Sequence, residues 1–457
     1  MPAPPASPGT RPGPEPPEPL PAAQQDALRD DAVELCARLI RFDTSNFGGG
    51  ESRGERAAAE WVAGQLTDAG LEPTVLESAP GRASTVVRIP GADPLAPALL
   101  VHGHLDVVPA EAADWSCDPF CGEVRDGAVW GRGALDMKNM DAMMIAFARH
   151  LARTGARPPR DVVMAFVADE EDTGDLGAVF LAGRHPELFE GVKAAISESG
   201  GTLLHLPGGG RLYPIAAGER GSAWLTATAR GTAGHGSRGS ADNALVQVAA
   251  AIGRIAAYEW PRRVVPTVRA LLDGLSEYLG APVDPEDLSV LGSVAPLVSH
   301  TLADSLNPTM LRAGYKHNVI PSEASVGLDG RVLPGTEAEF FATVDELLGP
   351  GFTRTGDYHA PVSADHTAPD FAAMAAALRA YDPQALVLPY CMTGGTDAKA
   401  FSRLGIPGFG FAPGRAPEGF DAWAYVHGVD EHVLVDSLAF GSRVLATYLL
   451  SDPLQSA

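Results

Sequence analysis

The sequence predicts an α/β fold with a mostly parallel sheet, interrupted by a smaller inserted α+β domain. Between about residues 31 and 200, continuous apolar runs typical of buried parallel strands alternate with helical patterns. Between about 217 and 355 the strands instead alternate apolar and polar residues, as half-exposed strands do. The chain has 457 residues, more than one compact core usually holds, so two domains are expected.

The first elements are two helices and a short strand. Apolar residues recur at helical spacing over 31–40, and we expect folding to begin near Gln24. A second helix is predicted over 55–69, with Ala59, Val62 and Leu66 facing inward, and Gly70 ends it as a C-cap glycine. The strand that follows, from Thr85, is closed by a proline.

Three apolar runs predict buried strands, over 98–102, 161–168 and 194–197. Residues 136–151 form a helical pattern rich in methionine. A methionine stripe at this spacing is more typical of a packed core than of a functional surface.

The second half of the chain changes character and then returns to the first pattern. Alternating strands are predicted over 222–230 and 323–333, with a helix over 241–258. From Phe371 the pattern is again helix, strand and helix, with the last helix over 433–450.

We therefore predict four segments. A Pro-rich tail over 1–24 carries no basic stretch followed by an apolar stretch, so it is expected to be a disordered tail and not a secretory signal. The main domain is expected in two parts, 25–216 and 356–457, around an insert over 217–355. Within the insert, residues 259–301 show no clear pattern.

Composition excludes several classes of protein. With 34 Lys and Arg against 57 Asp and Glu, the formal net charge is −23, which disfavours nucleic acid as a partner. No stretch reaches the roughly 18 to 20 apolar residues of a membrane helix. The four cysteines make no disulfide or zinc-finger pattern, so we expect reduced, buried thiols and a cytoplasmic protein. They are Cys36, Cys117, Cys121 and Cys391.

Polar residues collect where the predicted strands end, the usual ligand position in open α/β sheets. His104 and Asp106 follow the first buried strand, and an extended backbone would place both side chains on one face. The imidazole could bind a metal ion, or it could be an ordinary loop histidine. Asp136 follows a glycine-rich turn and could bridge two cations, or it could simply cap a helix.

An acidic run from Asp169 to Asp172 follows the next strand, and such a run is repulsive unless a cation or solvent screens it. Glu170 and Glu171 allow one carboxylate to bind metal while the other accepts a proton from water. Glu198 and His427 complete an inventory of two histidines and several carboxylates without a thiolate. That inventory suits a catalytic di-zinc or related site.

Seven motifs follow one another along the chain: GHLDVVP, GRGALDMK, ADEEDTG, GTAGHGS, HNVIPSEASVGLDGRVLPG, GGTDAKAF and HGVDEH. In this order and spacing they resemble the zinc-dependent exopeptidase and deacylase family of aminoacylase, acetylornithine deacetylase, succinyl-diaminopimelate desuccinylase, glutamate carboxypeptidase and carboxypeptidase S. The resemblance covers roughly residues 31–450. Two departures are Asn139, where the family usually has Gly, and Glu198 between two serines.

The resemblance implies a di-metal peptidase catalytic domain with an inserted lid domain that often forms a homodimer. It implies two divalent ions, zinc first and cobalt or manganese as alternatives. One ion would be held by His104, Asp136 and Glu198, and the other by Asp136, Glu171 and His427. Glu170 would be the general base, and Asp106 would hold His104.

In the lid, the resemblance implies that His235 stabilises the oxyanion and that Asn318 and Arg331 lie near the substrate. Gly395 and Thr396 would line the pocket. The expected reaction is hydrolysis of an amide or peptide bond in a dipeptide or N-acyl amino acid with a free carboxylate. Two alternatives stay open: amide formation, and a metal-dependent binding protein without catalysis. Arg331 could equally form a salt bridge within the lid.

Overall fold

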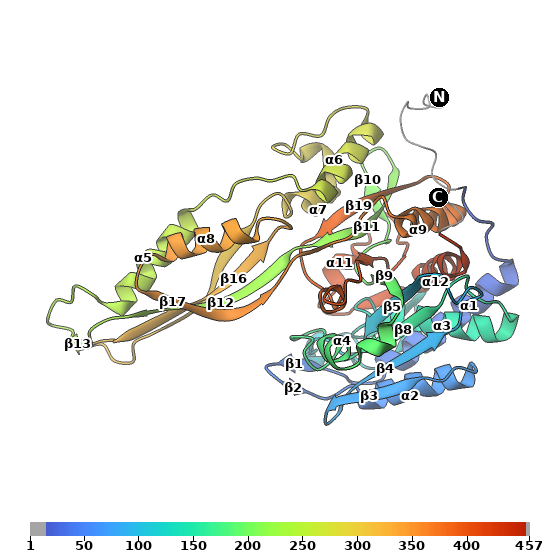
Figure 1. Cartoon of the computed structure of the whole chain (residues 1–457), viewed down its shortest axis with the longest axis horizontal. Helices are drawn as coiled ribbons and strands as arrows, with labels where there is room; N and C mark the ends of the chain where they lie inside the picture. Colours follow the sequence, from blue (N-terminus) through green and yellow to red (C-terminus); the bar gives the residue numbers. More distant parts are fainter. Residues whose placement is uncertain (1–14, 454–457) are drawn as a thin grey trace. The chain divides into compact units, whose positions relative to one another are not determined.

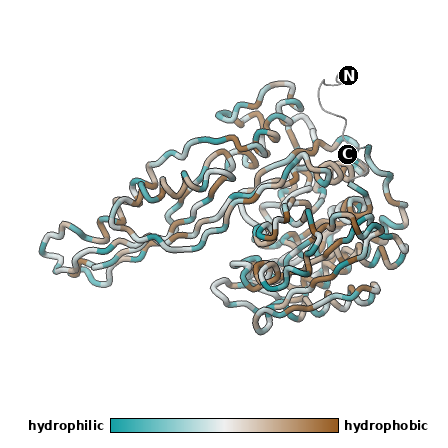
Figure 2. Tube along the Cα trace, in the orientation of Figure 1, coloured by the Kyte–Doolittle hydropathy of each residue, from teal (hydrophilic) through white to brown (hydrophobic). Residues whose placement is uncertain are grey.

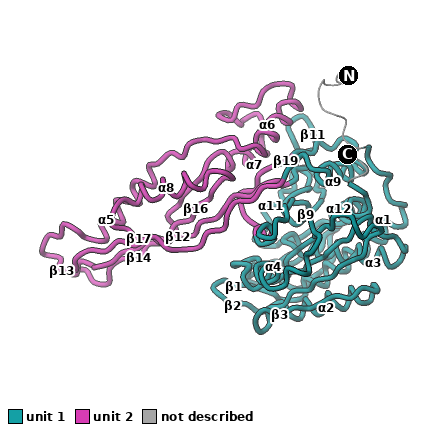
Figure 3. The backbone as a smooth tube through the Cα atoms, in the orientation of Figure 1, with its two compact units in different colours: residues 1–215, 365–388, 400–457 teal, residues 216–364, 389–399 magenta. Residues whose placement is uncertain are grey.

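The structure is a computed structural model that describes residues 15–453. The chain divides into two compact units (Figure 3). Unit 1 contains the chain up to residue 215 together with 365–388 and the chain from residue 400 onward. Unit 2 contains residues 216–364 and 389–399. Residues 1–14 of the predicted tail lie outside the described residues, and helix α1 already begins at Ala22.

Unit 1 is built on a mixed sheet with the strand order β10-β11-β20-β9-β5-β8-β4-β3 (Figure 1). The central strands from β20 to β8 are parallel, and β4 and β3 continue the sheet antiparallel. The predicted α/β class is confirmed, although the sheet is parallel only in its centre. The strands in this order are β3 (Thr74–Ala79), β4 (Arg82–Ile89), β5 (Ala98–His104), β8 (Val162–Val167), β9 (Val192–Ser197), β10 (Leu204–Leu206), β11 (Gly210–Glu219) and β20 (Gly408–Gly410). A further strand, β19 (Ala385–Met392), also pairs with β11.

Helices cover this sheet. Helices α1, α3 and α12 pack against one another, α9 packs on α12, and α2 packs on β3 and β4. Met140, Met143 and Met144 of α3 are buried, which confirms that the methionine stripe belongs to the core. Figure 2 shows hydrophobic residues concentrated along the strands and helices of unit 1. The helices are α1 (Ala22–Ile40), α2 (Arg56–Asp68), α3 (Lys138–Thr154), α4 (Ala178–Arg184), α9 (Pro369–Tyr381), α10 (Ala398–Ser402), α11 (Ala422–Tyr425) and α12 (Val435–Leu450).

Two small sheets complete unit 1. One is the hairpin of β1 and β2, which are joined by two glycines, Gly49 and Gly50, both with positive φ. The other places β7 between β6 and β21, so a segment near residue 130 is tied to the segment that precedes α12. These strands are β1 (Asn46–Gly48), β2 (Glu51–Ser52), β6 (Glu123–Arg125), β7 (Ala128–Trp130) and β21 (His432–Leu434).

Unit 2 contains an antiparallel sheet with the order β14-β16-β12-β17. Apolar side chains of β12 and β16 form a core with helices α5 and α8, which include Val248 and Phe340. Strand β17 pairs with β12, so the unit extends past the predicted boundary at residue 355. The elements are β12 (Gly221–Arg230), β13 (Gly234–His235), α5 (Ala244–Ala257), α6 (Pro266–Leu279), α7 (Ala295–Ser299), β14 (Ser305–Ala313), β15 (Val319–Ile320), β16 (Glu323–Val332), α8 (Glu337–Leu348), β17 (Phe352–His359) and β18 (Val362–Ser363).

Some local expectations need correction. Helix α5 begins at Ala244 and not at 241, because the Asn243 side chain caps it by accepting from the Leu245 N–H. Cys117 and Cys121 are free thiols, as predicted, but they are only partly buried, with their sulfurs 3.6 Å apart. Within residues 15–453, no helix combines the length and apolar character needed to cross a membrane.

Candidate functional site

Three parallel neighbours of the sheet deliver polar residues to one edge. His104 is the last residue of β5, and its backbone pairs with Val167 at the end of β8. The acidic run 169–172 follows β8, and Glu198 follows β9 directly. Because parallel strands end at a common edge, residues distant in sequence converge there.

Asp136 and His427 reach the same place from other segments. Asp136 lies between β7 and α3, two residues before the helix begins at Lys138. The alternative that Asp136 is the N-cap of this helix is therefore wrong, because the cap position belongs to Met137. His427 lies in the loop between α11 and β21 with a left-handed φ of 59°.

The Asp136 carboxylate lies between two imidazoles. Its Oδ1 is 3.0 Å from Nε2 of His104, and its Oδ2 is 3.1 Å from Nε2 of His427. The same nitrogen of His427 is 3.2 Å from Oε2 of Glu171. One carboxylate thus faces both histidines, as a bridging ligand must.

The remaining predicted residues lie in the same cluster. Ligand atoms of His104, Asp136 and Glu171 lie within 4.8 Å of one another, and so do those of His104, Glu170 and Glu198. The structure therefore brings together all five predicted ligands and the predicted base.

The electrostatics of the cluster favour added positive charge. Hydrogen bonds with Asp136 and Glu171 raise the pKa of His427 to about 10. Burial acts to lower the pKa of His104, but the hydrogen bond with Asp136 and the nearby carboxylates raise it well above its usual value. Burial acts to raise the pKa of Asp136, but hydrogen bonds with both histidines hold it below its usual range.

This donor set fits divalent metal ions. Imidazole nitrogens and carboxylate oxygens are ligands of zinc, cobalt and manganese. Oε1 of Glu171 is buried and has no hydrogen-bond partner among the residues that the structure describes. A buried carboxylate oxygen normally has a partner, so a cation at this position would satisfy it. The two groups of converging ligand atoms, His104 with Asp136 and Glu171 and His104 with Glu170 and Glu198, are the places where divalent ions could bind.

Asp106 organises the site by two routes. Nδ1 of His104 is 2.9 Å from the main-chain oxygen of Asp106 but 3.7 Å from its carboxylate. A carbonyl oxygen only accepts, so Nδ1 carries a proton, and loss of the Nε2 proton would leave a lone pair on Nε2 for a metal ion in the cluster. The Asp106 carboxylate instead accepts the main-chain N–H groups of Glu170 and Glu171, each at 3.1 Å. The predicted contact with His104 is therefore made by a different atom.

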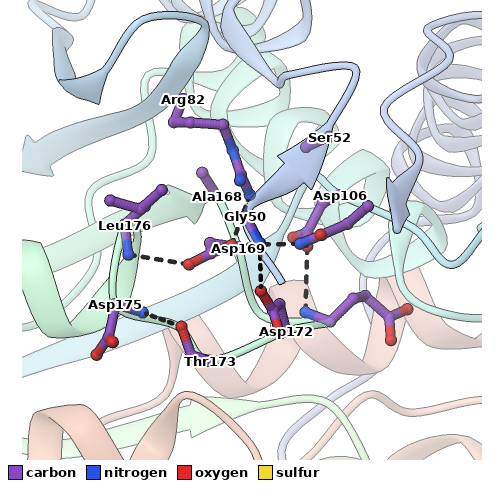
Figure 4. Close-up of polar contacts among 12 residues, drawn as sticks. Gly50, Ser52, Arg82, Asp106, Ala168, Asp169, Asp172, Thr173, Asp175 and Leu176 are labelled. Atoms are coloured by element: carbon purple, nitrogen blue, oxygen red, sulfur yellow. Dashed lines mark hydrogen bonds and ion pairs between the residues drawn. The ribbon is translucent and has the colours of Figure 1, made fainter. Parts of the chain in front are cut away.

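A buried network beside this turn was not predicted from the sequence (Figure 4). Arg82 donates from Nη2 to Oδ1 of Asp169 at 2.7 Å and from Nε to both carboxylate oxygens of Glu55. Nδ2 of Asn46 donates to Asp106 at 2.9 Å and to Asp169 at 3.3 Å. The only feature of the sequence that pointed to such a network was the acidic run after a buried strand, which needs positive charge nearby.

A second network joins the segment of Asp136 to the loop of His427. Glu431 is fully buried and accepts the main-chain N–H groups of Gly133, Leu135 and Asp136. It also accepts from Nη1 of Arg132 at 2.6 Å, and Arg132 donates from Nη2 to the main-chain oxygen of His427. Both residues lie in motifs noted above, but their contact was not predicted.

The other predicted residues belong to unit 2. His235 is exposed on β13, which pairs with β15, and its Nδ1 is 2.8 Å from Oγ of Ser237. Asn318 is exposed, and its main-chain oxygen accepts from the N–H of Gly236 at 2.8 Å. This bond ties the Asn318 segment to the His235 turn.

The predicted substrate-binding residues have partners within unit 2. Nε of Arg331 is 3.0 Å from Oδ1 of Asp329, so the salt bridge that the sequence left open is present. The N–H and the hydroxyl of Thr396 both donate to buried Glu219, so neither donor is available to a substrate in this structure. Gly395 lies against Lys399, whose Nζ would be 2.2 Å from an added Cβ.

Comparison with known proteins agrees with this geometry. Residues 100–451 match Peptidase family M20/M25/M40. Aminoacylase-1 of Sus scrofa is 29% identical over 366 residues, which cover 78% of this chain and 81% of that protein. The di-peptidase Dug1p of Saccharomyces cerevisiae superposes with a TM-score of 0.67 at 16% identity, covering 94% of this chain and 97% of that chain. The metallo-carboxypeptidase Sso-CP2 of Sulfolobus solfataricus gives 0.68 at 16% identity, covering 93% and 100%.

These findings define a hydrolase that acts on amide or peptide bonds. The chain belongs to peptidase family M20/M25/M40.

Proposed function

We propose that this protein is a two-metal hydrolase that cleaves the amide or peptide bond of a dipeptide or N-acyl amino acid with a free carboxylate. The observation that carries the proposal is the Asp136 carboxylate, which lies 3.0 and 3.1 Å from the Nε2 atoms of His104 and His427. The similarity to aminoacylase-1 supports the substrate class.

Each ion would have three ligands from the cluster. His104, Asp136 and Glu198 would hold one, and Asp136, Glu171 and His427 the other, with zinc as the first candidate and cobalt or manganese as alternatives. When bound, such ions lower the pKa of a water molecule and polarise the carbonyl that is attacked. The His427 side chain is 49% exposed, so this part of the cluster is open to solvent in unit 1.

Glu170 is the proposed general base. Its Oε2 lies 3.9 Å from Nε2 of His104, and its side chain is 16% exposed, so water can reach it. The carboxylate would take the proton from the attacking water and pass it to the nitrogen of the leaving amine. His235 of the lid would donate to the oxyanion, whose stabilisation is usually a large part of the rate enhancement.

Arg331 is the proposed partner of the substrate carboxylate. Its planar guanidinium already holds the Asp329 carboxylate, a pairing of the same chemistry as the one proposed for the substrate. When substrate binds, its carboxylate would therefore replace that of Asp329 as the partner of Arg331.

The proposal is tested with a panel of N-acyl amino acids and dipeptides, each paired with its C-terminal amide. Metal-free protein and protein loaded with zinc, cobalt or manganese would be compared. We expect metal-dependent hydrolysis of free acids and weak hydrolysis of the amides. Equal hydrolysis rates for the free acids and their C-terminal amides would show that the substrate carboxylate is not needed for recognition. Metal binding without turnover of any substrate would favour a non-catalytic binding protein, and net synthesis from amine and acid would favour amide formation.

A further inference from the structure

The turn that carries Glu170 and Glu171 begins with a buried residue in an unusual conformation. Asp169 is 2% exposed and has a φ of 71°. Residues other than glycine rarely adopt such a positive φ, and among them aspartate and asparagine adopt it most readily. A residue keeps such a conformation when its surroundings hold it. The contacts of Asp169 therefore determine how the chain enters the catalytic turn.

Both oxygens of Asp169 are held, from opposite sides. Oδ1 accepts from Nη2 of Arg82 at 2.7 Å, and Oδ2 accepts from the N–H of Leu176 at 2.9 Å. Figure 4 shows Arg82 and Leu176 on either side of this carboxylate. The ion pair is buried, because the Arg82 and Asp169 side chains are 6% and 2% exposed. A buried charged bond of this kind is among the stronger restraints available to a turn.

The same network continues to the two glutamates. Nδ2 of Asn46 joins Asp169 to the Asp106 carboxylate, which accepts the N–H groups of Glu170 and Glu171. The backbone of the two glutamates is thus anchored one and two residues after Asp169, where Arg82 holds the chain. Small misplacements of catalytic groups are costly, since an error of about 1 Å can lower a rate about 100-fold.

We infer that Asp169 and Arg82 are positioning residues that fix the base Glu170 and the metal ligand Glu171 through the backbone of their turn. This inference deepens the proposed function and rests on it for the role of Glu170. Its effect on Glu171 concerns metal binding and can be measured without any substrate.

Arg82 offers a matched pair of variants. Its second carboxylate partner, Glu55, is also buried but lies before α2, far along the chain from the catalytic turn. Asp169→Asn and Glu55→Gln each replace one carboxylate oxygen beside the same guanidinium with an NH₂ group, which cannot accept a hydrogen bond. A role limited to folding predicts similar effects of both changes, whereas a positioning role predicts an effect on the site from Asp169→Asn alone.

The experiment is a calorimetric titration of metal-free protein with Zn²⁺, together with steady-state kinetics and amide hydrogen exchange of the peptide that contains Glu170 and Glu171. We expect Asp169→Asn to weaken one zinc site about 10- to 100-fold and to lower kcat by a similar factor, as loss of a supporting group typically does. KM should stay near the wild-type value, and exchange in the turn should accelerate. Glu55→Gln should lower the thermal midpoint comparably and leave zinc affinity, kcat and exchange in the turn unchanged.

Wild-type zinc affinity and kcat in Asp169→Asn would overturn the inference, as would equal losses in Glu55→Gln. If Asp169→Asn does not fold, Arg82→Lys is measured instead. Lysine keeps the positive charge but has no planar guanidinium to donate to Asp169 and Glu55 at the same time. We therefore expect a partial loss of zinc affinity, and an unchanged zinc affinity would contradict the inference. If wild-type protein binds zinc but hydrolyses nothing, the proposed function fails while the zinc titration still decides the positioning role.

Discussion

Replacing Glu431 by glutamine tests whether the buried contact between Glu431 and Arg132 sets the geometry of the metal ligands. Oε1 of Glu431 accepts the N–H groups of Leu135 and Asp136, and Oε2 accepts from Gly133 and Nη1 of Arg132. Glutamine keeps one of these oxygens. Its NH₂ group would face two donors, so the main chain at Asp136 or the guanidinium must move.

The magnitude follows from these four bonds. The oxygen that is replaced accepts from two donors, and each lost hydrogen bond to a charged acceptor costs about 1.5 to 3 kcal/mol of folding free energy. In addition, the buried Arg132 guanidinium loses its countercharge. Breaking a buried ion pair by removing one partner typically costs about 3 to 5 kcal/mol, and the two estimates describe the same loss. We expect Glu431→Gln to lower the free energy of unfolding of unit 1 by about 3 to 5 kcal/mol without metal. Zinc affinity should fall at least about 10-fold, because Asp136 is a proposed ligand of both ions.

The assay is urea unfolding of metal-free protein combined with zinc titration. Asp370→Asn is the matched control, because Asp370 forms a largely buried pair with Arg160 and also accepts from the Tyr448 hydroxyl. Arg160 precedes the amino end of β8, at the opposite edge of the sheet from the metal ligands. The control should lose stability but keep zinc affinity. Unchanged zinc affinity in folded Glu431→Gln would refute the reasoning.

Four further outcomes are expected. Dialysis against a chelator should abolish turnover, and about two zinc, cobalt or manganese ions per chain should restore it, whereas full activity after metal removal would contradict the account. His235→Ala should lower kcat about 100- to 1000-fold with unchanged zinc content, as loss of one oxyanion donor does, and an unchanged kcat would exclude that role. Arg331→Met should raise KM about 10- to 100-fold for free acids and leave that of their C-terminal amides unchanged, as loss of one charged hydrogen bond implies. Gly103→Ala would place a Cβ 2.4 Å from Oδ1 of buried Asp141, so urea unfolding should show a loss of about 1 to 3 kcal/mol, and no loss would mean that the aspartate moves freely.

The sequence alone predicted that the candidate metal ligands would lie together, for a simple physical reason. Buried parallel strands are continuous apolar runs, and each run here is followed by a polar residue such as His104 or Glu198. Parallel strands end at one edge, so locating the strands also located the ligands. Element boundaries were less predictable, because a cap such as Asn243 depends on a side-chain hydrogen bond.

The supporting residues could not be predicted, because their contacts are long-range and leave no periodic pattern. Arg82 and Asp169 are 87 residues apart, and Glu431 is 295 residues from Asp136. Local spacing cannot show that a guanidinium far along the chain neutralises an acidic turn.

Atomic detail was equally hidden from the sequence. The pairing of His104 with Asp106 was expected, but the choice of the main-chain oxygen over the carboxylate depends on the local backbone. Thr396 was expected to face the substrate, yet both of its donors are held by Glu219, which is 177 residues away.

The central claim, that Glu170 transfers the proton in a two-metal hydrolysis, is tested most directly by kcat of Glu170→Gln on the best substrate of the panel. The matched control is Asp172→Asn, which neutralises another acid of the same turn that contacts the N–H of Gly50. We expect Glu170→Gln to retain two zinc ions and lose at least about 100-fold in kcat, while the control stays near wild type. A Glu170→Gln protein that turns over substrate at the wild-type rate would contradict the account.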